Sequence, residues 1–167
     1  MAKITKAIEI IAPIALVFDL LKPARLGEWY DLALHTQVRQ TNAAAFGLGA
    51  QLTIQNDLGT RQAEVIEFSA PAKLSWRQLD GRRQVAFLLF PVENTTNVQI
   101  IEDYRLAGPL GALADRLFMQ KRNAAAVAQS LANLKRLAEW EVYQQRQKLR
   151  GAEPPIGSSP ISLLDLT

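Results

Sequence analysis

The longest uninterrupted pattern in the sequence is a helical one in the last third of the chain. After Gly108-Pro109-Leu110-Gly111, neither Gly nor Pro occurs again until Gly151. Apolar residues recur in this stretch at steps of three, four or seven, which is the spacing of one face of an α-helix. They are Leu110, Leu113, Leu117, Ala124, Ala128, Leu131, Leu134 and Ala138. The pattern predicts one continuous helix over 110–138, and without a breaker its continuation over 140–150 is expected to project beyond the sheet.

The residues before this helix alternate with a period of two, which is typical of antiparallel strands with one buried face. Two short helices are expected after the first strand, because Pro13 suits the first turn of a helix and Pro23 ends that helix. Asp80-Gly81 predicts a hairpin turn. The strand around Val65 changes phase at Ile66, which predicts a β-bulge. The expected strands are 3–11, 34–41, 50–55, 61–68, 74–79, 85–92 and 98–106, and the expected short helices are 14–21 and 24–30.

A sheet with one apolar face must be covered, and only the long helix is large enough to cover it. We therefore expect an α+β fold in which a curved antiparallel sheet of about six to seven strands wraps round the long C-terminal helix. The strand 85–92 is apolar on both faces, so it is expected to be central or covered. The domain is expected to span 1–150, and 151–167 is expected to be a flexible tail. The tail ends in four apolar residues that, where ordered, would dock on the domain or on a neighbouring copy: Ile161, Leu163, Leu164 and Leu166.

Composition excludes several kinds of site. The chain of 167 residues suits one domain and contains no cysteine, so disulfides and thiolate metal sites are excluded. Its one histidine, His35, has the parity of the outward-facing residues of its strand. No apolar run reaches the roughly 18 residues of a membrane helix. We expect a cytoplasmic protein with no metal and no cofactor, and no residue is assigned a catalytic role.

The positive charge lies mainly on the long helix. Residues 108–150 hold eight Lys or Arg and three Asp or Glu, within a net charge of +3 for the chain. Such a run is usually a solvated helix face, but it also suits peripheral contact with an anionic membrane or a protein. Its basic pairs, Lys121-Arg122 and Lys135-Arg136, have no aromatic residues interleaved with them, so nucleic-acid binding is not expected. The oligomeric state stays open.

Several stretches together carry a family resemblance. They are Ile8–Pro13 followed by Val17-Phe18 and Trp29, Glu64–Pro71 followed by Leu74-Ser75-Trp76, Asn94–Asn97, Gly108–Gly111, and Leu134-Lys135 with Glu139. Over roughly residues 3–140 the chain resembles the START-like or SRPBCC superfamily of polyketide-cyclase and lipid-transport-like proteins. The resemblance implies a helix-grip fold with an apolar cavity between the sheet and the long helix. Its members share no set of catalytic residues, so none is carried over.

Glu102 is the most informative single residue. It has the same parity as Val98, Ile100 and Tyr104, which are expected to face inward. A carboxylate on an apolar face is costly unless it is paired or protonated. Glu102 would therefore anchor a ligand or act as a general acid or base beside Tyr104. The alternatives are a bulge that turns it outward, or a structural partner such as an inward arginine.

The other candidate ligand-binding residues are apolar. Trp76 and Phe87 would add aromatic bulk to the inner face, which suits either a pocket or a plain core. Trp29 would close the cavity or cap the core. Small side chains at Ala124 and Ala128 would leave space for a ligand under the sheet, or would simply favour the helix.

The function expected from these features is binding of an apolar or amphipathic small molecule, such as a lipid, an isoprenoid or a polyketide. One alternative is an enzyme of the polyketide cyclase or dehydratase type. Another is an interaction protein whose cavity is filled by its own side chains. Binding is favoured over catalysis, because the inner face offers few polar groups that could converge on a substrate.

Overall fold

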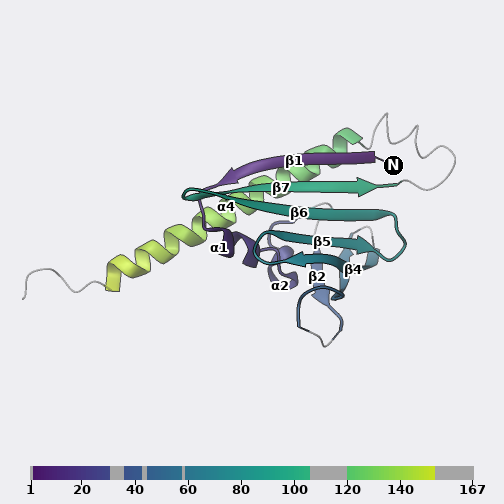
Figure 1. Ribbon diagram of the computed structural model, residues 1–167, viewed down its shortest axis with the longest axis horizontal. Helices are drawn as coiled ribbons and strands as arrows, with labels where there is room; N and C mark the ends of the chain where they lie inside the picture. Colours follow the sequence, from purple (N-terminus) through teal and green to yellow (C-terminus); the bar gives the residue numbers. More distant parts are fainter. Residues whose placement is uncertain (1, 31–35, 43–44, 58, 106–119, 153–167) are drawn as a thin grey trace, which may run out of the picture.

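The structure is a computed structural model in which one curved sheet partly encloses a long helix (Figure 1). It describes residues 2–30, 36–42, 45–57, 59–105 and 120–152. The long helix is α4 (Gln120–Ala152), and the other described segments build a seven-stranded sheet and two short helices. This arrangement confirms the predicted α+β helix-grip fold.

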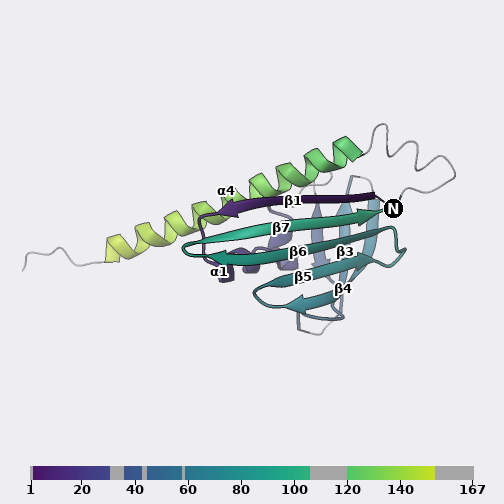
Figure 2. The same ribbon diagram turned by 45° about the horizontal axis from the view of Figure 1, so that its top comes forward.

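All strand pairs in the sheet are antiparallel, in the order β1-β7-β6-β5-β4-β3-β2. Strands β2 to β7 follow one another as neighbours, and β1 pairs with the free edge of β7. The sheet curves so strongly that β3 crosses the direction of β1 and β7 in Figure 2. The strands are β1 (Ala2–Ile10), β2 (Gln37–Gln40), β3 (Gln51–Asn56), β4 (Gly59–Ser69), β5 (Lys73–Gln78), β6 (Arg83–Val92) and β7 (Thr95–Tyr104).

Three local predictions about the strands are confirmed. The register between β4 and β5 shifts between Val65 and Glu67, which is the expected bulge. Gly81 has a φ of 68° in the turn between β5 and β6, where an L-residue with a side chain would be strained. Strand β6 lies between β5 and β7, as its two apolar faces indicated.

The two short helices are α1 (Ile14–Asp19) and α2 (Pro23–Leu26). The second is shorter than the expected 24–30, because the chain leaves the helix at Gly27 and buries Trp29 and Tyr30. Gly27 passes close to the neighbouring backbone, and a Cβ at this position would lie 2.7 Å from the carbonyl oxygen of Thr36. A glycine here therefore lets α2 end directly against the segment that leads into β2.

Helix α4 buries the predicted face against the sheet. Leu131 is 2% exposed and Leu134 is 0% exposed, as expected. The helix continues past residue 138, and its last part projects beyond the sheet (Figures 1 and 2). Trp140 is 57% exposed there and Leu149 is 71% exposed. The first part of the predicted helix, with Leu117, lies outside the described residues.

Polar contacts fix α4 to the start of the chain. Lys135 Nζ donates a hydrogen bond to the carbonyl oxygen of Glu9 over 2.8 Å, and the backbone N–H of Ile11 donates to Glu139 Oε1 over 3.0 Å. Arg25, in α2, forms an ion pair with Glu141. The helix is thus held lengthwise along β1 rather than only by its apolar face.

Some expectations are not tested by the described residues. His35 and residues 153–167 lie outside them, so the division of the chain into a domain and a tail stays a prediction. Within the described ranges, no helix combines the length and apolar character needed to cross a bilayer.

Candidate functional site

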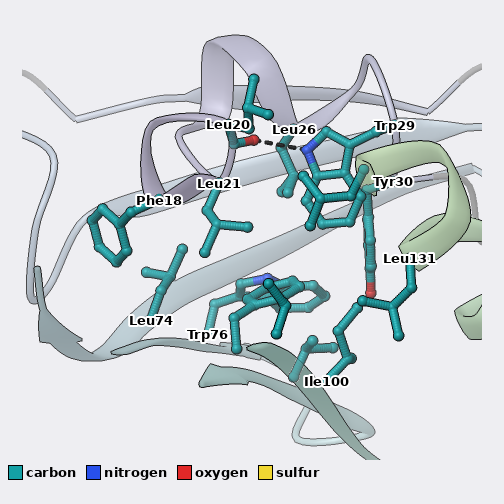
Figure 3. Packing of buried hydrophobic residues seen from close by; sticks show 14 of the residues in the cluster. Phe18, Leu20, Leu21, Leu26, Trp29, Tyr30, Leu74, Trp76, Ile100 and Leu131 are labelled. Carbon is teal, nitrogen blue, oxygen red and sulfur yellow. Dashed lines mark hydrogen bonds between the residues drawn. The ribbon is translucent and has the colours of Figure 1, made fainter. Parts of the chain in front are cut away.

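An aromatic cluster lies between the short helices and the concave face of the sheet. Trp29, Tyr30, Trp76 and Phe87 meet edge to face, with ring centroids 5.5–6.3 Å apart. Figure 3 shows Trp29 beside the short helices, Tyr30 beneath it, and Trp76 against the sheet. The indole Nε1 of Trp29 donates a hydrogen bond to the carbonyl oxygen of Leu20 over 2.7 Å. This bond fixes the orientation of Trp29 in the core, and the Trp29 ring packs against the Tyr30 ring.

The inner face of the sheet changes from apolar to polar at one end. In five strands, a polar side chain within two residues of the strand end faces the concave side. The ladder register places two of them, Arg83 and Tyr104, opposite each other on β6 and β7. The five residues are Asn56, Arg61, Gln78, Arg83 and Tyr104.

A pocket of about 310 Å³ opens at this polar end, where α4 begins. Its deep wall is formed by buried side chains of Tyr30, Ile54 and Trp76, and its outer part carries charged and amide side chains. The lining residues are Tyr30, Thr36, Ile54, Asn56, Arg61, Trp76, Gln78, Arg82, Arg83, Tyr104, Arg105, Arg122 and Asn123. The pocket therefore joins an apolar interior to a polar opening, which is typical of small-molecule sites.

Two polar groups in the deep wall are not satisfied by the described part of the chain. The Tyr30 hydroxyl and the Trp76 Nε1 are buried and have no hydrogen-bond partner there. A buried donor without a partner costs roughly 1–3 kcal/mol. Burial raises the pKa of Tyr30 well above its usual range, the negative charge of Glu102 raises it further, and Arg83 partly offsets both. The phenol therefore stays protonated, and its hydroxyl remains a hydrogen-bond donor.

Glu102 lies behind this lining and not in it. It faces inward as its parity indicated, is 0% exposed, and pairs with Arg83, whose Nη2 lies 2.6 Å from Oε1. No hydrogen bond of regular geometry reaches either carboxylate oxygen from the described residues. Burial raises the pKa of Glu102 above its usual range, and Arg83 opposes that rise. Of the three alternatives for Glu102, the inward arginine is the one observed, and the outward bulge is wrong.

The other predicted site residues divide into two groups. Trp76 and Tyr104 line the pocket. Trp29 and Phe87 are buried in the core beneath it and, like Ala124 and Ala128, are not among the lining residues. Ala128 is on the exposed side of α4, so the small helix residues do not create the pocket. Ligand contact at any of the seven positions stays a prediction.

Sequence reasoning missed the arginines of the lining. Arg83 has the same parity as Val85, Phe87 and Leu89, so it could have been recognised as inward-facing had the strand been started two residues earlier. Arg122 gives no such signal, because only the packing of α4 brings it to the pocket. No group of three or more metal-ligating side chains occurs among the described residues.

Solved structures share this fold at low identity. The Aha1 dimer from Colwellia psychrerythraea is 18% identical, with a TM-score of 0.62 over 83% of this chain and 97% of that one. A protein from Bacillus halodurans is 20% identical, with a TM-score of 0.65 over 83% of this chain and 98% of that one. A protein from Chromobacterium violaceum is 18% identical, with a TM-score of 0.61 over 83% and 99% of the two chains. Among curated proteins, no significant match is found.

A family model matches nearly the whole globular part of the sequence. It covers residues 1–139, from the first strand to the part of α4 that packs on β1. The match agrees with the helix-grip architecture and with the structural relatives above. The chain therefore belongs to the polyketide cyclase/dehydrase and lipid transport family, within the START-like superfamily.

Proposed function

We propose that this protein binds an amphipathic small molecule in the pocket at the polar end of the sheet. The observation that carries the proposal is that Tyr30 and Trp76, which line an open pocket, each hold a buried donor with no hydrogen-bond partner among the described residues. A ligand with an acceptor oxygen beside its apolar body would satisfy them. The family description, which includes lipid transport, supports a ligand of this kind.

The shape of the pocket also supports binding of a small molecule. Its volume of about 310 Å³ lies at the lower end of the range of about 300–1,000 Å³ for such sites. Ile54 and Trp76 offer apolar contact area, and Gln78 and Asn56 add groups that both donate and accept hydrogen bonds.

Binding is favoured over cyclase or dehydratase chemistry by the position of Glu102. An acid–base catalyst must come within hydrogen-bond reach of the substrate proton. Glu102 is separated from the pocket by Arg83 and is not among its lining residues. Glu102, the strongest candidate for proton transfer, therefore forms an ion pair with Arg83 and does not line the pocket.

The test is a fluorescence titration with phenylnaphthylamine, a neutral apolar probe. Gln78 lies at the pocket end of β5, where a larger side chain would fill the space without entering the closed core. We expect Gln78→Trp to weaken probe binding by about tenfold or more, equivalent to about 1.4 kcal/mol. Gln55→Trp makes the same change on an exposed position of β3 and is expected to bind like the wild type.

Circular dichroism and thermal unfolding would establish that both variants are folded. Equal probe affinity for folded Gln78→Trp and the wild type would refute binding in this pocket. Failure of the wild type to bind any apolar probe would instead favour the interaction protein with a self-filled cavity.

A further inference from the structure

The charge of the pocket is strongly one-sided. Its described lining contains five arginines and no Asp or Glu. They come from separate parts of the fold: β4, the turn before β6, β6 itself, the residue after β7 and the first turn of α4. They are Arg61, Arg82, Arg83, Arg105 and Arg122.

These arginines occupy the outer part of the pocket. Four of them are exposed, and Arg83, with 25% of its side chain exposed, lies deepest and pairs with Glu102. Tyr30, Ile54 and Trp76 are buried and form the inner wall. The apolar part of an amphipathic ligand would therefore enter first, and the head group of the ligand would remain among the guanidinium groups.

The hydrogen-bonding groups here are mostly donors. A guanidinium has five N–H donors, no acceptor, and a charge that persists at any physiological pH. The Tyr30 hydroxyl and the Trp76 Nε1 are two further donors, both more than nine-tenths buried and without a partner in the described chain. Such a set suits an acceptor-rich anionic group, and charge-assisted hydrogen bonds to a carboxylate or phosphate are among the strongest in proteins.

We propose that the pocket selects amphipathic anions over neutral apolar molecules. The carboxylate, sulfonate or phosphate head is held by the arginines at the opening, and the apolar body packs on Ile54 and Trp76. This inference rests on the proposed function and specifies its ligand class. The role of Arg83 in it depends on Glu102, which holds the guanidinium at the pocket wall.

The test compares two probes that share a ring system. Anilinonaphthalene sulfonate carries an anionic head, and phenylnaphthylamine lacks it. In low salt we expect the wild type to bind the sulfonate about tenfold more tightly, because its charged head accepts charge-assisted hydrogen bonds from the arginines. The preference should shrink as salt is added, since the outer arginines are exposed.

The variant Arg61→Gln/Arg122→Gln is expected to lose most of this preference, measured as the ratio of its affinities for the two probes. Both residues are exposed, so the substitution spares the buried pair of Arg83 and Glu102. Arg136→Gln/Arg146→Gln is the control, because it also removes two positive charges from exposed positions, but outside the pocket lining.

Four outcomes separate the possibilities. Loss of preference in the pocket variant alone supports the proposal. Equal affinity of the wild type for both probes overturns it but leaves the proposed binding function intact. If the wild type binds neither probe, both the anion preference and the proposed binding function are overturned. Equal loss in the control variant, together with pelleting on phosphatidylglycerol vesicles, would assign the anion preference to the long helix and overturn the pocket proposal.

Discussion

The ion pair between Glu102 and Arg83 links the core to the pocket. Glu102 stands among apolar side chains of β7, where a lone carboxylate would be costly. Arg83 is the first residue of β6 and is only partly buried, so its guanidinium contacts Glu102 from the edge of the core. Glu102 is therefore a positioning residue, whose effect on a ligand passes through the orientation of Arg83.

Replacement of Glu102 by Gln is expected to change how stability depends on pH. The folded-state pKa of Glu102 is raised above the ordinary 4.5, so the fold binds this proton more tightly than the unfolded chain does. The unfolding free energy of the wild type relative to Glu102→Gln should be greatest below the ordinary pKa and should decline as the pH rises through the raised value. Urea unfolding at a series of pH values measures this difference.

The contradicting result is a difference that stays constant, or one that grows with pH. Growth would mean that Arg83 stabilises the carboxylate more than burial destabilises it. Glu93→Gln, in the exposed turn between β6 and β7, shows the effect of removing a carboxylate from the surface.

Helix α4 has two parts with different roles. Up to Ala138 its apolar face is buried against the sheet, and from Trp140 onward large apolar side chains are exposed. The change falls where Glu139 accepts a hydrogen bond from the segment after β1 and Glu141 forms an ion pair with α2. The first part is therefore a component of the core, and the second is an extension from it.

Leu131→Ala is expected to lower the unfolding free energy by about 2–5 kcal/mol, because it leaves a cavity in a closely packed core. Leu149→Ala makes the same change on the exposed end of the helix and should cost less than about 0.5 kcal/mol. Denaturant unfolding of both variants gives the comparison. A loss of only a few tenths for Leu131→Ala would mean that the packed helix face is wrongly assigned.

The elements were predictable because each depends on a local pattern. The period-two strands, the bulge near Val65 and the turn at Gly81 can be recognised within single segments. The pocket was not predictable, because Arg61, Gln78 and Arg83 meet only through the register of three neighbouring strands. Parity also fails to distinguish Trp76, which lines the pocket, from Phe87, which is covered by Tyr30 and Trp29.

The shape of the whole molecule explains why the site lies at one end. Strong curvature brings β3 and β4 round toward the start of α4, so that strand ends far apart in sequence surround one space (Figure 2). At the opposite end, α1 and α2 cover the concave side, and the aromatic cluster packs between them and the pocket that Tyr30 and Trp76 line. The fold is therefore closed by core packing along most of its length and open at the polar end.

The three tryptophans give a direct test of binding at this end. Their indole N–H groups occupy three different environments. The Trp29 group is hydrogen-bonded to Leu20 in the core, and Trp140 is exposed on the projecting helix. Trp76 lines the pocket, and its buried N–H group has no partner among the described residues. Each gives a separate side-chain signal in a proton–nitrogen correlation spectrum, assigned by replacing one Trp with Phe at a time.

Titration with anilinonaphthalene sulfonate, which combines an apolar ring system with a charged head, tests most directly whether an amphipathic molecule binds in this pocket. We expect a large, saturable shift of the Trp76 indole signal and little change at Trp29 and Trp140. A shift that is largest at Trp140 would place the probe on the projecting helix, and binding without any shift at Trp76 would place it elsewhere. Either result would show that the pocket is not the binding site.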